Sequence, residues 1–347
     1  MPDLDYGYTV TIKTPATSNP TATTVTNQWQ RQLPNNTKWE DVGSGETYKI
    51  ASGDRSAKIR LQQDLDGAKV YSNELQVTSN EFDMAGGLGQ LGDFSEPYKW
   101  AGGVLAPNGK IYGIPYSTGT VLEIDPVGRT ATTFGSLSGN YKWSGGVLAP
   151  NGKIYGIPNH SSSVLEIDPV SRIAKTFGSL TGSSNWIGGV LAPNGKIYGI
   201  PFGSSTVLEI DPTNLDNLGF PTLSTFGSLS GDYKWYGGVL APNGKIYGIP
   251  NNPTTVLEID PVRRTTKTFG SLTGSDKWLG GVLAPNGKIY GIPNNSTSVL
   301  EIDPGSQTIS TFGSLSGNHK WLGGVLAPNG KIYGIPHNSS SVLEIDP

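Results

Sequence analysis

The sequence predicts an all-β protein, and three features of its 347 residues support this prediction. The fourteen residues GGVLAPNGKIYGIP occur six times, first at 102–115. The tryptophan before each copy recurs at intervals of 43, 43, 49, 43 and 43 residues. Each interval holds only short apolar runs separated by Gly, Pro and Asn turns, which leaves no room for a helix. This period is the length of one four-stranded blade, so the repeats predict a six-bladed β-propeller.

The strands of one repeat follow from its turn residues. The first strand, GGVLAP, ends at a Pro-Asn-Gly turn, which suits a tight hairpin with glycine in the left-handed conformation. KIYGIP is the second strand and VLEID is the third. The third strand ends at Asp-Pro, where the aspartate can accept hydrogen bonds from the turn backbone, and TFGSL forms the fourth strand.

The two ends of the repeat region predict a closed ring. The last repeat has three strands and no fourth, while the segment 88–91 before the first repeat matches the fourth-strand sequence. We expect this segment to complete the last blade, which would remove both exposed sheet edges. One repeat is longer by six residues, at 212–223, and we interpret this insertion as a longer surface loop or a docking contact.

Residues 1–80 differ from the repeats and precede the propeller domain, which spans 81–347. Alternating polar and apolar residues around Trp29 and around Ile59 predict strands separated by turn clusters. This part resembles the immunoglobulin-like β-sandwich modules of phage structural and bacterial surface proteins, although it lacks the cysteine pair of antibody domains. The resemblance implies a core of Trp29, Ile59, Leu61, Val70 and Leu75.

Composition excludes several functions. The formal net charge is −3 and there is no basic tract, so we expect no nucleic-acid partner. No signal sequence or long apolar run is present, so we expect no membrane insertion. The chain has no cysteine and its three histidines lie in different repeats, so we expect no cofactor, no metal and no catalytic residues.

The repeated Glu and Asp of VLEID resemble catalytic carboxylate pairs, but alternation places Glu123 and Asp125 on one face of a strand that packs against a neighbouring blade. We expect Glu123 to pair with Lys110 on the adjacent strand and Asp125 to hold its turn. The alternative is an anion site made by a ring of six lysines. These lysines are Lys110, Lys153, Lys196, Lys245, Lys288 and Lys331.

One tryptophan per repeat is interpreted as filling the gap between wedge-shaped blades, with a ring of partly exposed stacking platforms as the alternative. These tryptophans are Trp100, Trp143, Trp186, Trp235, Trp278 and Trp321.

The loops that vary between repeats follow the second strand and precede each tryptophan, so both lie on one face of a propeller. The candidate ligand-binding residues on this face are Tyr98, Tyr116, Tyr141, His160, Phe202, Tyr233, His319 and His337. Rings among small polar side chains suit glycan or protein recognition, although ordinary polar loops remain an alternative.

The repeat unit, with its glycine pair, its NGKIY hairpin and its VLEIDP strand, resembles kelch repeats, with phenylalanine in place of the fourth-strand tryptophan. It is also similar to highly repetitive propellers of marine phages and unicellular algae. This resemblance implies a phage virion protein, tail- or capsid-associated, whose residues 1–80 bind other virion proteins and whose propeller binds a host glycan or receptor. Homo-oligomers are compatible with it. Alternatives are a purely architectural decoration protein, a propeller enzyme acting on a polysaccharide or lactone, and a cytoplasmic location.

Overall fold

The computed structural model describes residues 5–11, 25–33, 37–45, 47–51, 57–65, 68–71, 75–76, 90–95, 97–182 and 184–347. The chain divides into two compact units, Met1–Gln90 and Leu91–Pro347. In the described ranges every regular element is a β-strand, so the predicted all-β class is confirmed. Those ranges contain no helix of membrane-spanning length and hydropathy.

The first unit contains two small antiparallel sheets. One sheet pairs β1 with β4, and the other has the order β3-β2-β5-β6 with β7 also paired to β5. The strands are β1 (Asp5–Thr11), β2 (Val25–Gln32), β3 (Glu40–Ser44), β4 (Thr47–Ala51), β5 (Lys58–Leu65), β6 (Ala68–Tyr71) and β7 (Leu75–Gln76). Trp29 packs on Ile59 and Leu61, as expected, and also on Val42. The side chains of Val70 and Leu75 lie outside the described residues.

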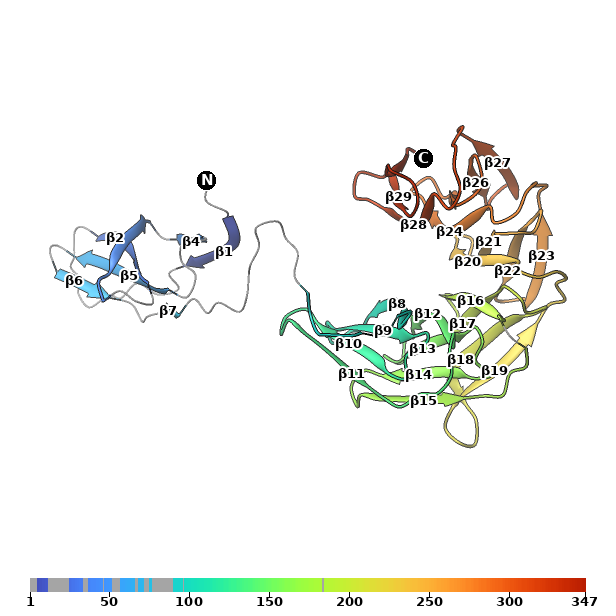
Figure 1. Cartoon of the computed structure of the whole chain (residues 1–347), viewed down its shortest axis with the longest axis horizontal. Helices are drawn as coiled ribbons and strands as arrows, with labels where there is room; N and C mark the ends of the chain where they lie inside the picture. The colour runs from blue at the N-terminus through green and yellow to red at the C-terminus, as the bar shows by residue number, and fades with distance from the viewer. Residues whose placement is uncertain are drawn as a thin grey trace. The chain divides into compact units, whose positions relative to one another are not determined.

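The second unit contains five antiparallel sheets of four strands and a last sheet of three (Figure 1). The first strands are β8 (Trp100–Leu105), β12 (Trp143–Leu148), β16 (Trp186–Leu191), β20 (Trp235–Leu240), β24 (Trp278–Leu283) and β28 (Trp321–Leu326). The second strands are β9 (Ile111–Pro115), β13 (Ile154–Pro158), β17 (Ile197–Pro201), β21 (Ile246–Pro250), β25 (Ile289–Pro293) and β29 (Ile332–Pro336). The third strands are β10 (Val121–Asp125), β14 (Val164–Asp168), β18 (Val207–Leu215), β22 (Val256–Asp260), β26 (Val299–Asp303) and β30 (Leu343–Ile345). The fourth strands are β11 (Thr130–Phe134), β15 (Ile173–Phe177), β19 (Pro221–Phe226), β23 (Thr265–Phe269) and β27 (Thr308–Phe312).

The turns form as the sequence predicts. Gly109 has φ of 78° and donates its N–H to the Ala106 carbonyl oxygen at 3.0 Å, which closes the hairpin between β8 and β9. Asp125 accepts hydrogen bonds from the Val127 and Gly128 N–H groups at 3.0 and 2.7 Å, which holds the turn between β10 and β11. Because the same residues recur, the same geometry recurs in the other units.

Neighbouring sheets interlock through an isoleucine and a glycine. Ile157 of β13 has no exposed surface and lies over Gly189 of the next sheet, where an added Cβ would come within 2.6 Å of its Cδ1. The same contact joins every sheet to the next, and each junction contains one buried apolar cluster with residues from both sheets. The core is therefore five successive copies of one interface, as in repeat proteins.

The predicted ring is not closed in this structure. The sheets follow an arc whose first and last members, carrying β8 and β28, lie at its two ends (Figure 1). Glycines of successive first strands approach closely from Gly102 to Gly323, but an added Cβ on Gly323 would meet nothing within 4 Å. Gln90 and Leu91 belong to no strand, β30 pairs only with β29 among the described residues, and positions 88 and 89 lie outside those residues. The described residues therefore do not show the predicted strand completing the last sheet.

The insertion at 212–223 extends a hairpin. β18 and β19 reach beyond the length of their counterparts, and Asp216 holds the new turn by accepting hydrogen bonds from Leu218 and Phe220 N–H groups. Phe220 stacks on Phe177 of the preceding sheet with ring centroids 5.5 Å apart. The insertion thus adds a contact between two sheets that the other junctions lack.

Candidate functional site

We use the name variable-loop face for the two sets of loops that differ between units, namely those after each second strand and those before each tryptophan. The predicted placement of both sets on one face is confirmed, because hydrogen bonds join them. In the second repeat the backbone N–H of Asn159 donates to the Lys142 carbonyl oxygen at 2.8 Å. The backbone N–H of Lys142 donates to the Tyr116 carbonyl oxygen of the preceding sheet at 2.9 Å. Backbone bonds therefore fix this face while its side chains vary.

Residues two positions before each tryptophan have a left-handed backbone. They have φ between 48° and 53° although none is glycine, and they are Tyr98, Tyr141, Ser184, Tyr233, Asp276 and His319. A non-glycine residue in this region is uncommon and clusters at ligand sites and switches. Residue type alone gives no signal for this conformation, so the sequence did not reveal it. A position whose residue varies between repeats therefore keeps one backbone conformation.

Five of the eight predicted residues meet in two aromatic groups. Tyr141 lies against Tyr116 and His160 with ring centroids 5.2 and 5.8 Å away. Phe202 lies 5.2 Å from Tyr233 and 6.0 Å from Tyr236. Tyr236 was not predicted, because its position in the first strand holds Ala, Ser, Ile or Leu in the other units.

The two aromatic groups come from four consecutive sheets. Burial raises the pKa of Tyr236, and the negative charge that Tyr116 can carry raises it further. Tyr116 follows the second strand of the first sheet, and Tyr236 lies in the first strand of the fourth. We call the set Tyr116, Tyr141, His160, Phe202, Tyr233 and Tyr236 the aromatic cluster.

The other three predicted residues lie apart from this cluster. Among the described residues Tyr98, His319 and His337 have no ring-to-ring contact, and Tyr98 is 75% exposed. His319 Nδ1 lies 3.1 Å from Asn294 Oδ1, and the backbone N–H of His319 donates to Asn295 Oδ1 at 2.8 Å. The variable-loop face thus has an aromatic part and a part of amides and histidine.

Lysines lie beneath this face and were not recognised in the sequence as buried. Lys142, Lys234, Lys277 and Lys320 precede their tryptophans, are at most 3% exposed and donate to backbone carbonyl oxygens. Burial lowers the pKa of each, and lowers that of Lys277 to about 8. The ammonium groups of Lys142, Lys277 and Lys320 link their own loops to the preceding sheet.

The third repeat departs from this arrangement because Asn185 replaces the lysine. Asn185 N–H donates to the Asn159 carbonyl oxygen at 2.9 Å, so the two asparagines lie together. Both are at least 95% buried, and within the described part of the chain Asn159 Oδ1 and Asn185 Nδ2 have no hydrogen-bond partner. A buried donor and a buried acceptor are costly without partners, so this junction is the weakest point beneath the face.

The tryptophans are structural, as interpreted. Trp143, Trp186, Trp235, Trp278 and Trp321 are at most 4% exposed, and each packs against the preceding sheet. Each indole N–H donates to a carbonyl oxygen twenty residues further on, at 2.7–3.0 Å. Trp100 has no preceding sheet and is covered in part by Phe94, with centroids 5.1 Å apart. The alternative of a ring of exposed stacking platforms is wrong.

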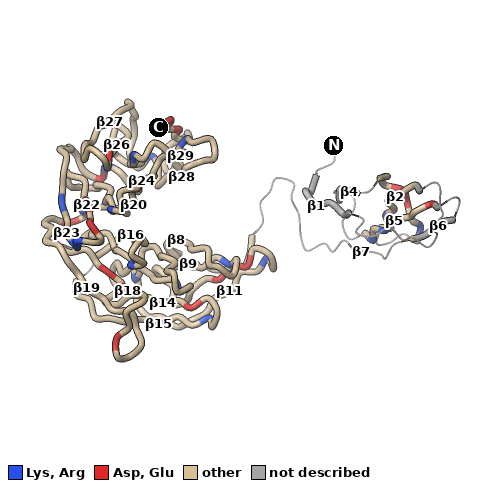
Figure 2. The backbone as a smooth tube through the Cα atoms, turned by 180° about the vertical axis from the view of Figure 1, so that it is seen from behind, with Lys and Arg blue, Asp and Glu red and all other residues tan. Residues whose placement is uncertain are grey.

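The opposite face holds the repeated carboxylates, and the predicted lysine pairs are confirmed. Lys110 Nζ lies 3.0 Å from Glu123 Oε1, and the five equivalent distances are 2.6–3.1 Å. The second glutamate oxygen accepts a hydrogen bond from a tyrosine, such as Tyr198 to Glu209 at 3.1 Å. Figure 2 accordingly shows acidic and basic positions interspersed in this unit. These lysines are therefore engaged in pairs and do not form a free anion site.

Arginines across the junctions complete this network and were missed in the sequence. Arg172 Nε lies 3.2 Å from Glu123 Oε2 of the preceding sheet, and Arg264 Nε lies 3.3 Å from Glu209 Oε2. Both arginines have φ of 55° at a turn. Their reach depends on how neighbouring sheets are placed, which no pattern within one repeat reveals.

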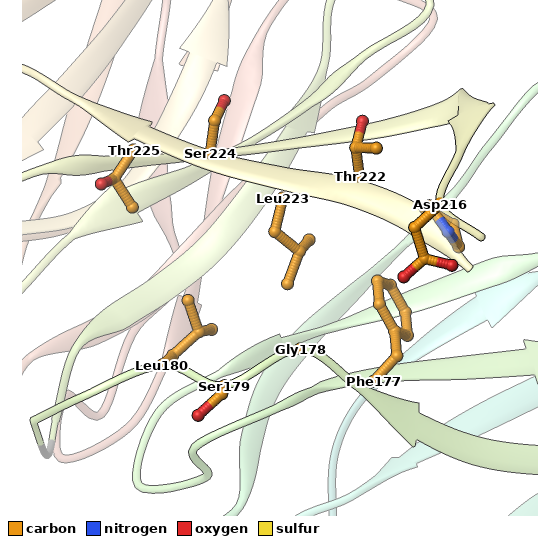
Figure 3. Close-up of a pocket in the computed structure, with 10 residues that line it drawn as sticks. Phe177, Gly178, Ser179, Leu180, Asp216, Thr222, Leu223, Ser224 and Thr225 are labelled. Atoms are coloured by element: carbon orange, nitrogen blue, oxygen red, sulfur yellow. The ribbon is translucent and has the colours of Figure 1, made fainter. Parts of the chain in front are cut away.

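A hollow of about 460 Å³ lies beside the insertion (Figure 3). Leu223 points into it between Phe177 and Leu180, and Asp216 lies at one end. Ser179, Thr222, Ser224 and Thr225 also line the hollow. The described residues contain no group of three His, Asp or Glu side chains that could hold a metal.

Repeated four-stranded sheets packed face to face around an arc define a fold of the β-propeller class. The chain resembles virginiamycin B lyase from Staphylococcus aureus, with a TM-score of 0.60 at 12% identity over 73% of this chain and 86% of that one. It also resembles a streptogramin B lyase, with a TM-score of 0.58 at 14% identity over 73% and 85% of the two chains. A protein from Lactobacillus plantarum is similar over 92% of both chains, with a TM-score of 0.56 at 12% identity. No family model and no curated protein sequence matches the chain.

Proposed function

We propose that this chain is a non-enzymatic recognition protein whose aromatic cluster binds a glycan or a protein receptor. The observation that carries the proposal is the contrast within the repeats, since backbone bonds hold all six loop pairs alike while the residues at their tips differ. Tyr141 and Tyr233 are about half exposed and keep a left-handed backbone. Exposed rings on a rigid support offer contact area at little cost in conformational entropy.

A glycan suits this surface because aromatic faces stack on the C–H faces of sugar rings while amide and hydroxyl groups bind their hydroxyls. Under this proposal the six sheets are six propeller blades, and the first unit is an immunoglobulin-like module that attaches the chain to a virus particle. The support for attachment is the resemblance of residues 1–80 to virion modules. Mass spectrometry of purified particles tests the location, and absence of the chain from them would contradict it.

Binding is tested with the full chain on a glycan array, comparing the natural sequence with Tyr141→Ala. Removing the ring that joins Tyr116 and His160 should weaken binding at least about tenfold, the usual effect of losing an aromatic anchor. Val127→Ala is the matched control because Val127 is 93% exposed on the opposite face. Equal loss in both variants, or binding to nothing on the array, would contradict the glycan proposal.

The second candidate is an enzyme, favoured by the structural similarity to virginiamycin B lyase and streptogramin B lyase. The carboxylates opposite the variable-loop face are bonded to lysine and tyrosine, which leaves them poorly suited to acid or base chemistry. His160, His319 and His337 are the remaining candidates on the face itself. Incubation with virginiamycin B followed by mass spectrometry tests this candidate, and conversion lost in His160→Ala would replace the recognition proposal.

A further inference from the structure

The two ends of the arc expose the two halves of the interface that joins every other pair of sheets. Five isoleucines of the second strands, Ile114, Ile157, Ile200, Ile249 and Ile292, have no exposed surface. Their counterpart in the last sheet, Ile335, is 49% exposed. Val342 is 59% exposed, whereas its five counterparts are at most 3% exposed. The last sheet therefore presents the side chains that elsewhere enter the following sheet.

The first sheet presents the receiving half. Gly146, Gly189, Gly238, Gly281 and Gly324 each lie under an isoleucine of the preceding sheet, at 2.5–2.7 Å from a Cβ added there. Their counterpart Gly103 would meet only its own sheet, at Ile111 and Tyr112. Leu105 is 63% exposed, whereas its counterparts in the next four sheets are partly buried against the sheet before them.

We propose that the last sheet packs on the first sheet of the same chain, with Ile335 over Gly103, to form a sixth copy of the junction. The partner is the same chain because both halves belong to one unit and are held at a high effective concentration, so they meet before a second molecule can. The arrangement needs no residue from 88–91. It differs from strand addition, because side chains and not backbone bonds close the ring.

Closure would complete the variable-loop face. At two other junctions an asparagine supports the left-handed residue of the next unit, since Asn252 Oδ1 accepts from Asp276 N–H at 2.9 Å and Asn295 Oδ1 accepts from His319 N–H at 2.8 Å. Asn338 holds the same position in the last repeat, and Tyr98 is the residue with a left-handed backbone in the first repeat. The sixth junction would therefore make a sixth subsite from Tyr98, His337 and Asn338, three residues that the open arc holds apart.

The test uses thiol labelling, because the natural chain has no cysteine. The rate constant for labelling is measured in Ile335→Cys, in Ile292→Cys as the buried counterpart, and in Val127→Cys as the exposed reference. We expect Ile335→Cys to react roughly 100-fold more slowly than Val127→Cys, as buried groups that require opening do. The protection should not depend on protein concentration, and sedimentation should give the mass of one chain.

Gly103→Ala is tested with Val342→Cys as the probe, because Ile335 must remain in place for the added methyl group to clash with it. Val342→Cys alone should be protected, and the double variant should label rapidly. Labelling of Ile335→Cys as fast as Val127→Cys would overturn the proposal, because the arc would then be open in solution. Protection that rises with concentration together with the mass of two chains would overturn it in favour of a second copy. Protection of Val342→Cys that Gly103→Ala leaves unchanged would also overturn it, because another segment would then cover this end of the last sheet.

Discussion

Alkaline pH should unfold this protein through its buried tyrosines. Tyr155, Tyr198 and Tyr247 have no exposed surface, and each donates its hydroxyl proton to a glutamate. Burial raises the pKa of Tyr198 and Tyr247 to about 12 and raises that of Tyr155 further. In the unfolded chain these phenols titrate near pH 10.

The sign follows from proton binding. Above pH 10 the unfolded chain has lost phenol protons that the folded chain still holds, so the free energy of unfolding falls as pH rises through 10 to 12. Each tyrosine contributes at most about 1.4 kcal/mol per pH unit. Screening by nearby water reduces this, so the three together should lower stability by about 2–4 kcal/mol per pH unit.

The assay is urea unfolding at pH 9 to 11.5, followed by circular dichroism, with tyrosinate absorbance recorded in parallel. Tyr198→Phe should lower stability at pH 8 by about 1–3 kcal/mol, because Glu209 and Asn194 lose a buried partner. The same variant should make the alkaline slope shallower by at most about 1.4 kcal/mol per pH unit, since one of the titrating phenols is gone. Full tyrosinate absorbance appearing near pH 10 with the fold intact would refute this reasoning.

Three further predictions concern the junctions and loops. Gly189→Ala should lower stability by about 1–3 kcal/mol through a clash with Ile157, and Ile157→Ala in the same chain should remove that clash, which a double-mutant cycle measures; additive costs would contradict the predicted contact. Burial lowers the pKa of Lys277 to about 8, so the folded chain binds fewer protons and stability should rise as pH rises from 8 to 10.5. Lys277→Met should reduce that rise in urea titrations, and an unchanged rise would show that Lys277 keeps its ordinary pKa. Asp168→Ala should cost about 0.5–2 kcal/mol because the Val170 and Ser171 N–H groups lose their acceptor, and a change in melting temperature no larger than that of Val170→Ala would count against this role.

The sequence predicted what depends on one repeat. The first three strands, the turn at Gly109, the pairing of Lys110 with Glu123 and the packing of Trp186 follow from residue type and alternation. The fourth strand lies earlier than expected, at Thr130–Phe134 and not at 133–137. Geometry between repeats was not predictable in this way, because the reach of Arg172 to Glu123 depends on the angle between neighbouring sheets.

Part of the candidate site was also beyond sequence patterns. The aromatic residues were identified because they vary between repeats, but their division into a cluster and separate residues depends on which sheets face one another. The left-handed backbone at Tyr141 and the burial of Lys142 gave no signal, since tyrosine and lysine usually indicate ordinary exposed loops. Closure by the segment 88–91 is not seen among the described residues, and similarity to a strand sequence does not say where a segment lies.

The isoleucine-to-glycine junction also bears on how such a chain changes during evolution. Because every sheet carries both halves of the same contact, unequal recombination between repeats could add or delete one unit while leaving each remaining contact intact. Identical coding repeats favour such exchange. Gain or loss of a unit would alter the width of the arc and the order of loop sequences together, so new combinations of tips could arise without redesign of the core.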